Sequence, residues 1–206
     1  MRSFFIALMS IFVDISTIGK CRKEIFSPQD LTEHYKNEIN DFQLDGVYIG
    51  AHYVDVRDSI EAYKYRSDRQ YAWEYVDVLA KVVDKYVEKE NNSCAIIAIP
   101  MHWSRYMIRG FDHIGLLVTR LSSRLSIPYE KPLQAKFTHR QSKLSKAKRM
   151  QNRDQAFRMK TWKKLPEIVM LVDDIISTGS TVNACAKILK ASGVKKVYGV
   201  FIASNQ

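Results

Sequence analysis

Two adjacent carboxylates and a cluster of small hydroxyl-bearing residues stand together near the C-terminal end of the sequence. Asp173 and Asp174 directly follow an apolar run at 168–172, and after two isoleucines comes a turn made of Ser177, Thr178, Gly179, Ser180 and Thr181. Small side chains let an anion approach backbone N–H groups, so this turn is suited to a phosphate. Carboxylates repel phosphate, so the two acids would instead accept hydrogen bonds from a sugar diol or hold Mg²⁺.

A strand and a helix must position this turn. The β-branched apolar run at 168–172 predicts a buried strand that ends by Asp173, and apolar residues at three- and four-residue spacing predict a helix from 182 that stops at Ser192-Gly193. Backbone N–H groups at the helix N-terminus would then bind the phosphate. Because neighbours in a strand point to opposite faces, we expect one aspartate to reach the ligand and the other to hold the loop. The lysine of a Walker loop is absent.

A second loop carries donors for anions. The apolar run at 94–99 predicts a buried strand, and the loop after it, at 100–110, contains Arg105, Arg109 and His102. Loops that leave the carboxyl ends of parallel strands line one crevice, so we expect this loop to share a rim with the Asp173 loop. Arginines offer forked donors to pyrophosphate oxygens. The sequence therefore predicts a second anion site beside the first.

The remaining segments predict an α/β domain with a mostly parallel sheet, because strands and helices alternate along the chain. A hairpin is expected at 41–53, where Asp45-Gly46 suits a two-residue turn. Further strands are expected at 94–99, 133–137, 156–159 and 197–203. Helices are expected at 56–64, from Ser67 to Val87, and after Asp112 as N-cap. The inner face of the second helix is expected to consist of Ala72, Val76, Leu79, Val83 and Val87.

The positive charge of the chain is concentrated in one segment. The 206 residues carry a formal net charge of +10, and the segment from Lys131 to Lys164 holds twelve Lys and Arg against one acid, Asp154. Such a segment is either a solvated or flexible arm, or an electrostatic trap for polyphosphates or nucleic acid. Its central part, 138–155, is polar and lacks amphipathic order, which predicts a mobile excursion.

Cysteine usage and the N-terminal region set further expectations. Cys21, Cys94 and Cys185 lie far apart, which predicts neither a disulfide framework nor a zinc site and favours a cytoplasmic location. The apolar run at 4–13 is too short to span a bilayer, so we expect it to pack on the domain, with a secretory signal as the alternative. We expect residues 1–40 to form an appendage and residues 41–206 the main domain.

Four stretches resemble known families. The segment 168–181 is similar to the phosphoribosyl pyrophosphate (PRPP) motif of type I phosphoribosyltransferases, with its strand, two acids, two apolar residues and Ser/Thr-Thr-Gly-x-Thr turn. Three other segments resemble the ComF (competence protein F) family. The matching positions are Val56, Arg57, Ile60, Lys64 and Tyr65; Pro100, His102, Arg105, Arg109, Gly110 and Phe111; and Thr138, Gln141, Leu144, Arg149, Asn152 and Phe157.

The chain departs from the family pattern at two places. Asp112 and His113 stand where the ComF family has Asn and Gln. The family commonly opens with a zinc ribbon built from two Cys-x-x-Cys pairs, whereas this chain has only Cys21 in that region. A closed zinc site needs four ligands, so we expect no zinc here and read residues 1–40 as a degenerate remnant of the ribbon.

The resemblance implies a type I phosphoribosyltransferase fold and a Mg²⁺-dependent transfer of phosphoribosyl from PRPP to a nitrogen acceptor, linked to natural competence and DNA uptake. It implies that Arg105 and Arg109 stabilise the departing pyrophosphate, that Asp173 and Asp174 hold the ribose hydroxyls and Mg²⁺, and that the 177–181 turn binds the 5′-phosphate. Met101 and His102 would add contacts to PRPP. The basic loop would close as a lid through Thr138, Arg140, Gln141, Arg149 and Asn152.

A second hypothesis belongs to another class of protein. The chain could be a non-catalytic PRPP sensor, or a protein that handles single-stranded DNA through the segment from Lys131 to Lys164. Purine-salvage enzymes of the wider family have a carboxylate base where this chain has Ser177, which argues against a hypoxanthine-type acceptor. The acceptor stays open between ammonia, another amine and an unusual base. Competence proteins are a further expected class of partner, and a homodimer is a further option.

Overall fold

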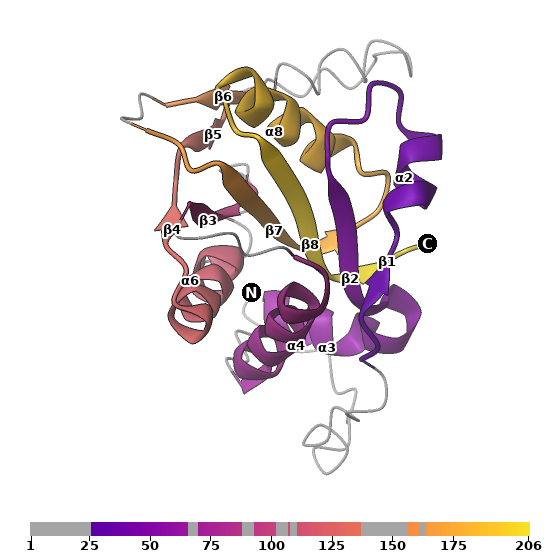
Figure 1. Cartoon of the computed structure of the whole chain (residues 1–206). Helices are drawn as coiled ribbons and strands as arrows, with labels where there is room; N and C mark the ends of the chain where they lie inside the picture. Colours follow the sequence, from indigo (N-terminus) through magenta and orange to yellow (C-terminus); the bar gives the residue numbers. More distant parts are fainter. Residues whose placement is uncertain are drawn as a thin grey trace, which may run out of the picture.

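The structure is a computed structural model that describes residues 26–65, 70–87, 93–101, 107, 111–136, 156–160 and 164–206. Hydrophobic residues at strand and helix spacing produce the following elements along the chain (Figure 1): β1 Gln29–Asp30, α2 Thr32–Glu38, β2 Gly46–His52, α3 Tyr53–Tyr65, α4 Gln70–Tyr86, β3 Cys94–Ala98, α6 His113–Leu125, β4 Tyr129–Glu130, β5 Leu133–Ala135, β6 Phe157–Met159, β7 Ile168–Ile176, α8 Ser180–Ala191 and β8 Lys196–Ser204.

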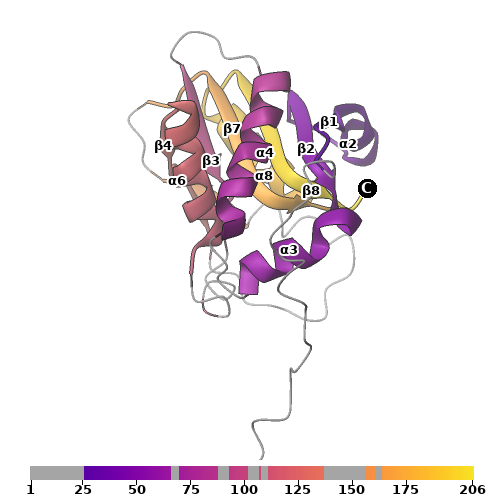
Figure 2. The ribbon, with the colours of Figure 1, turned by 90° about the horizontal axis from the view of Figure 1, so that it is seen from below.

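A six-stranded sheet with the order β1-β2-β8-β7-β3-β4 forms the centre of the domain. The strands from β2 to β4 in this order are parallel to one another, and β1 is antiparallel to β2. Figures 1 and 2 show helices on both faces of the sheet, with α4 and α6 packed side by side on one face. The predicted fold class, an α/β domain with a mostly parallel sheet, is confirmed.

Strand β7 separates two hydrophobic cores. Its residues Ile168, Met170 and Val172 point into the core formed with α3, α4 and α6, whereas Val169 and Leu171 point into the core formed with α2, α8 and the β5–β6 ribbon. All five side chains are buried, as expected for a strand covered on both faces. Asp173 and Asp174 continue this alternation, so their side chains leave the strand on opposite faces of the sheet.

The predicted end of this strand at Asp173 is wrong. Strand β7 continues to Ile176 and stays paired with β8, with Ile175 opposite Ala203 and Ile176 opposite Ser204. The two isoleucines supply enough apolar side chain to keep the strand in the sheet beyond the acids. Both acids are therefore held by a strand and not by a loose turn.

The predicted hairpin at 41–53 is also wrong. Strand β2 pairs in parallel with β8 on one side and with β1 on the other. Asp45 joins the start of β8, because its backbone N–H donates to the Val197 carbonyl and its carboxylate accepts from the Val197 N–H at 2.7 Å. A two-residue hairpin turn needs positive φ, and among the described glycines only Gly179 and Gly193 have it.

The other predicted elements have counterparts in the structure. Helix α3 includes the predicted 56–64. The five expected inner residues of the next helix are all buried, and the last of them, Val87, lies one residue beyond the end of α4. Helix α4 begins at Gln70 among the described residues; the predicted start at Ser67 lies outside them. Asp112 caps α6 by accepting from the Gly115 N–H at 2.8 Å. The predicted strands at 133–137 and 156–159 form the antiparallel β5–β6 ribbon.

Residues 29–38, which lie within the expected appendage, contribute to the sheet and its core. Strand β1 pairs with β2, and the Tyr35 side chain on α2 is buried in the core beneath α8. Cys21 and the apolar run at 4–13 lie outside the described residues. Within the described ranges, no helix has the length and hydrophobicity needed to cross a membrane.

Candidate functional site

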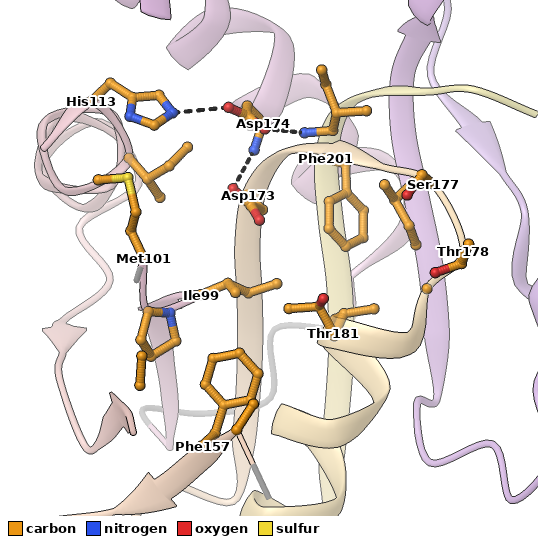
Figure 3. Close-up of a pocket in the computed structure, with 18 of the residues that line it drawn as sticks. Ile99, Met101, His113, Phe157, Asp173, Asp174, Ser177, Thr178, Thr181 and Phe201 are labelled. Atoms are coloured by element: carbon orange, nitrogen blue, oxygen red, sulfur yellow. Dashed lines mark hydrogen bonds and ion pairs between the residues drawn. The ribbon is translucent and has the colours of Figure 1, made fainter. Parts of the chain in front are cut away.

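A cavity of about 470 Å³ lies at the carboxyl ends of β3 and β7, where open parallel sheets bind their ligands (Figure 3). Its lining includes seven of the predicted site residues: Met101, Asp173, Asp174, Ser177, Thr178, Gly179 and Thr181. Ile99, Phe157 and Phe201 form an apolar part of the wall. The structure therefore brings the two acids and the small-residue turn together around one space.

The turn from Ser177 to Gly179 leads directly into α8. Gly179 is the N-cap residue and has a φ of +66°, a conformation that glycine adopts at little cost. The Ser180 hydroxyl lies 2.9 Å from the Thr178 hydroxyl. The first N–H groups of a helix have no acceptor within the helix, and α8 presents them at this turn. This arrangement suits a phosphate.

Helix α2 and the residue after it pack against the turn. The Tyr35 hydroxyl donates to the Ser177 carbonyl at 3.1 Å and lies 3.0 Å from the Ser204 hydroxyl. A Cβ atom on Gly179 would come within 2.6 Å of Ile39 Cδ1 and 3.0 Å of the Tyr35 ring. Glycine at position 179 is thus required by close packing as well as by its backbone conformation.

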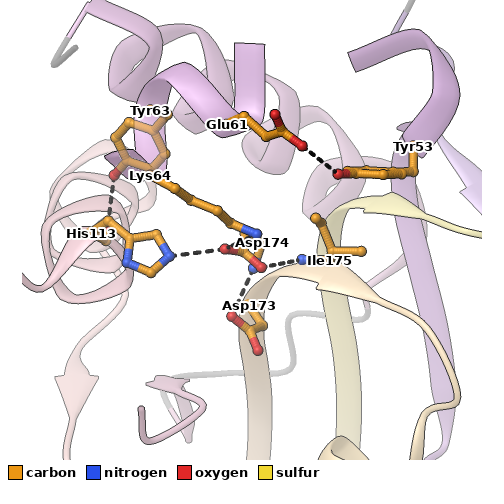
Figure 4. A network of polar contacts seen from close by, with 8 residues as sticks. All are labelled: Tyr53, Glu61, Tyr63, Lys64, His113, Asp173, Asp174 and Ile175. Carbon is orange, nitrogen blue, oxygen red and sulfur yellow. Dashed lines mark hydrogen bonds and ion pairs between the residues drawn. The ribbon is translucent and has the colours of Figure 1, made fainter. Parts of the chain in front are cut away.

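Asp174 is the centre of a buried charge network (Figure 4). Its Oδ2 atom lies 2.8 Å from Lys64 Nζ on α3 and 2.9 Å from His113 Nε2 on α6. Its Oδ1 atom accepts from the Ile175 N–H at 2.7 Å. All three side chains are buried. Both carboxylate oxygens of Asp174 are therefore committed to protein partners.

The surroundings of Asp174 keep it ionised. Burial on its own acts to raise the pKa of this carboxyl, but the hydrogen bond from His113 and the charge of Lys64 outweigh burial. The net result is a pKa below the ordinary value of an aspartate. The Tyr63 hydroxyl donates to the His113 carbonyl at 2.6 Å and fixes the start of α6 against α3. The network thus joins α3, β7 and α6.

Asp173 has a different environment. Its side chain is partly exposed and lines the cavity, and its Oδ1 accepts from the Asp174 N–H at 2.9 Å. One carboxylate thus faces the cavity while its neighbour is bound within the protein. That Asp173 contacts a ligand stays a prediction.

Sequence reasoning missed the roles of Lys64, His113 and Tyr35. The sequence indicated Lys64 only as a match to one segment of the ComF pattern, and His113 only as a departure from another segment of that pattern. Lys64 follows the core residue Ile60 by four positions, which puts it on the buried face of α3. A lysine on the buried face of a helix needs an acidic partner, so this position could have predicted a buried ion pair. For Tyr35, which reaches a turn 142 positions away, the sequence held no such signal.

Several predicted site residues cannot be placed, because they lie outside the described residues. These are His102, Arg105 and Arg109 in the loop after β3, and the lid residues Thr138, Arg140, Gln141, Arg149 and Asn152. Ser180 is described and stands at the first position of α8. The proposed contacts of the two arginines and the lid residues with PRPP stay predictions.

The described residues can hold Mg²⁺ only in a limited way. Asp173 offers a carboxylate to the cavity, whereas both oxygens of Asp174 are engaged. Among the described residues, no group of three or more His, Cys, Asp or Glu could hold a metal ion. Mg²⁺ commonly binds one or two carboxylates together with substrate phosphates and water, and Asp173 fits that pattern.

Comparisons with known proteins identify relatives. The chain is 38% identical over 107 residues to "Competence protein F" of Haemophilus influenzae, which covers 50% of this chain and 47% of the relative. It is 26% identical over 142 residues to "Competence protein ComFC" of Streptococcus pneumoniae, which covers 69% and 60%. It is 33% identical over 107 residues to "DNA utilization protein YhgH" of Escherichia coli, which covers 50% and 45%. The chain thus spans about half the length of most of these relatives.

The chain path partly matches those of two solved phosphoribosyltransferases. An orotate phosphoribosyltransferase from Aeropyrum pernix has a TM-score of 0.41 and 13% identity, with 84% of this chain and 81% of that chain covered. A purine phosphoribosyltransferase from Pyrococcus horikoshii has a TM-score of 0.38 and 17% identity, with 64% and 86% covered. No family model matches the sequence. Over these stretches the chain is similar in sequence to competence protein F and to ComFC.

Proposed function

We propose that the chain binds PRPP with Mg²⁺ and transfers its phosphoribosyl group to a nitrogen acceptor, with release of pyrophosphate, in a process linked to DNA uptake. The observation that carries this proposal is the turn from Ser177 to Gly179, which opens α8 beside Asp173 at the edge of one cavity. At about 470 Å³ the cavity falls within the range of roughly 300–1,000 Å³ typical of small-molecule sites.

PRPP would be held by two kinds of contact. The 5′-phosphate would accept hydrogen bonds from the backbone N–H groups of the turn and of the first residues of α8. The ribose hydroxyls would donate to Asp173, which faces the cavity from the strand just before the turn. Asp174 would act indirectly, by fixing the end of β7 through Lys64 and His113.

The reaction would depend mainly on the control of charge. The bond between the anomeric carbon and the pyrophosphate oxygen breaks as the acceptor nitrogen forms a bond to that carbon, and the pair of electrons leaves with pyrophosphate. Mg²⁺, when bound, would neutralise charge on the pyrophosphate. Arg105 and Arg109 are the donors expected to stabilise the same group. The lid residues are expected to exclude water, which would otherwise hydrolyse PRPP.

The acceptor is an amine that does not depend on a carboxylate base from the turn. Ser177 occupies the position where such a base would stand, and a hydroxyl is a weak base at neutral pH. Ammonia or a primary amine attacks through its own lone pair and then releases a proton to water.

A second candidate function is PRPP binding without turnover, in a protein that handles single-stranded DNA. Two observations favour it: the relatives carry the names "Competence protein" and "DNA utilization protein", and the described part of the segment from Lys131 to Lys164 is rich in exposed cations. Pyrophosphate release separates the two functions, because a sensor would bind PRPP and leave it intact.

Calorimetry with PRPP and Mg²⁺ tests the binding step. We expect Asp173→Asn to weaken PRPP binding about tenfold or more, because hydrogen bonds to a charged group contribute about 1.5–3 kcal/mol. A matched control is Asp58→Asn, which changes an exposed aspartate on α3. Equal PRPP affinity of all three proteins, or no binding by the unaltered chain, would contradict the proposal. Pyrophosphate release would then be measured with ammonia and a panel of amines.

A further inference from the structure

A second cavity lies beside the first. Its volume is about 860 Å³, and it is lined by residues from the end of β3, the N-cap of α6, the edge strand β4 and the β5–β6 ribbon. Ile99, Pro100, Met101, Ala135 and Lys136 line both cavities. The two spaces are therefore neighbours that share one wall.

The second cavity has an excess of positive charge. Lys131, Lys136, Arg158 and Lys160 line it together with one carboxylate, Asp112. All four cations are exposed, and within the described part of the chain none of them forms an ion pair with a carboxylate. Like charges around a concave surface attract anions more strongly than the same charges on a flat one.

Three lysines near α8 have a different environment. Lys187, Lys190 and Lys195, in and after α8, pair with Asp41, Asp45 and Glu167 at 2.7, 2.6 and 2.9 Å. The chain thus neutralises its lysines near α8 internally. The four cations of the second cavity have no such carboxylate partner among the described residues.

The β5–β6 ribbon displays its cations in a regular way. Leu133 is buried in the core, and Phe157 and Met159 pack against that core. Gln134 and Arg158, which are cross-strand partners, alternate with these residues, and Arg158 donates to Gln134 at 3.3 Å. The Lys136 and Lys160 N–H groups donate to the Ala156 and Pro132 carbonyls and continue the ladder on both sides. One face of the ribbon is therefore apolar and the other basic.

An aromatic side chain completes the lining. Lys131 Nζ lies 4.8 Å from the centre of the Tyr129 ring. Burial, with a smaller contribution from Asp112, raises the pKa of Tyr129 to about 12, so its phenol stays neutral at physiological pH and can donate a hydrogen bond. Tyr129 adds a donor to the cavity without adding a negative charge.

We propose that the second cavity is a binding site for a ligand with several phosphate groups, distinct from the site at the Ser177–Gly179 turn. Two sources have this chemistry: the backbone of a nucleic-acid strand and a free polyphosphate. The proposal does not require that PRPP binds in the first cavity. It depends only on the cations around the second.

The test compares two double variants with equal loss of charge. Arg158→Ala with Lys160→Ala removes two cations from the second cavity, and Lys81→Ala with Lys195→Ala removes two exposed cations elsewhere. The probes are a labelled short oligothymidylate, followed by anisotropy, and inorganic tripolyphosphate, followed by calorimetry. We expect the first variant to bind the probe about tenfold more weakly. For the oligothymidylate, the plot of log affinity against log salt concentration should become less steep by about 1.4. The second should stay within about twofold of the unaltered chain.

The outcomes separate the ligand sources and can overturn the proposal. Weakened binding of the oligothymidylate alone assigns the cavity to a strand, and weakened binding of tripolyphosphate alone assigns it to a free polyphosphate. Lys131→Ala, which changes a residue ahead of the β5–β6 ribbon, should weaken binding of the same probe. Equal affinities of the two double variants, or no binding of either probe by the unaltered chain, would overturn the proposal.

PRPP titrations keep this proposal separate from the proposed function. Arg158→Ala with Lys160→Ala should leave PRPP affinity unchanged, and Asp173→Asn should leave the affinity for the weakened probe unchanged. If Asp173→Asn abolished binding of that probe, the probe would occupy the first cavity and the second site would be refuted. Absence of PRPP binding by the unaltered chain would refute the proposed function alone.

Discussion

The first cavity has a wall of buried charges on one side and a wall of backbone on the other. On the charged side, Lys64 and His113 hold Asp174 between α3 and α6. On the other side, the Ser177–Gly179 turn rests on Tyr35 of α2 and contains no charged side chain. The comparison shows two ways to fix a site: ion pairs and hydrogen bonds in a dry core, and close packing under a helix N-terminus.

The largest expected effect comes from the charged wall. Asp174→Asn leaves Lys64 buried without its counter-charge, and breaking a buried pair in this way costs about 3–5 kcal/mol of the free energy of unfolding. Asp173→Asn, on a partly exposed side chain, should change the same quantity by less than about 0.5 kcal/mol. Urea unfolding followed by circular dichroism measures both. Similar losses for the two variants would refute the different environments of the two acids.

The backbone wall should respond to added volume. Gly179→Ala places a Cβ within 2.6 Å of Ile39 in a backbone conformation with positive φ, and we expect a loss of about 2–3 kcal/mol in the free energy of unfolding. Gly193→Ala is the matched control, because its φ is +96° and a Cβ there would meet nothing within 4 Å. That control should lose only about 1 kcal/mol. If both lost the same amount, packing under the turn would not matter.

Removing the support of the turn should have a smaller effect. Tyr35→Phe deletes the hydroxyl that donates to the Ser177 carbonyl, which should cost about 1–2 kcal/mol of stability. If the turn binds phosphate, PRPP affinity should also fall, and Tyr86→Phe, which removes a hydroxyl bonded to the Pro28 carbonyl, should leave it unchanged. Loss of stability with unchanged PRPP affinity would show that Tyr35 supports the fold and not the site.

Acid provides the mildest test of the charged wall. Because the pKa of Asp174 is lowered on folding, its contribution to stability is present above the ordinary pKa of an aspartate, near 3.8, and is lost as pH falls toward the lower folded value. Below about pH 4, the unaltered chain should lose up to about 1.4 kcal/mol per pH unit relative to Asp174→Asn. Urea unfolding at a series of pH values checks this. A pH-independent difference between the two proteins would contradict the network.

The sequence predicted the parts of the molecule that depend on local pattern. The strand before Asp173, the helix after Gly179, the buried face of α4 and the cap at Asp112 all follow from spacing along the chain. It failed where a contact joins distant segments. Asp45-Gly46 has the composition of a hairpin turn, yet its conformation is set by the start of β8, about 150 residues away.

The site was predictable to the same extent. One continuous stretch contains both acids and the turn, so residues 173–181 were identified directly. The partners of Asp174 come from α3 and α6, which are 110 and 61 positions away, and no local pattern joins the three segments. The sequence indicated the second cavity only through the excess of positive charge between Lys131 and Lys164. The shape of the cavity depends on how the β5–β6 ribbon packs beside β3.

The alternation along β7 makes the two acids dependent on strand parity. Residues 168–172 feed two different cores in turn, and the acids inherit opposite sides from that order. Deleting or inserting one residue within 168–172 would reverse the faces of the residues on one side of the change and would disrupt both cores. The positions of the two acids are therefore fixed by the same alternation that fills both cores.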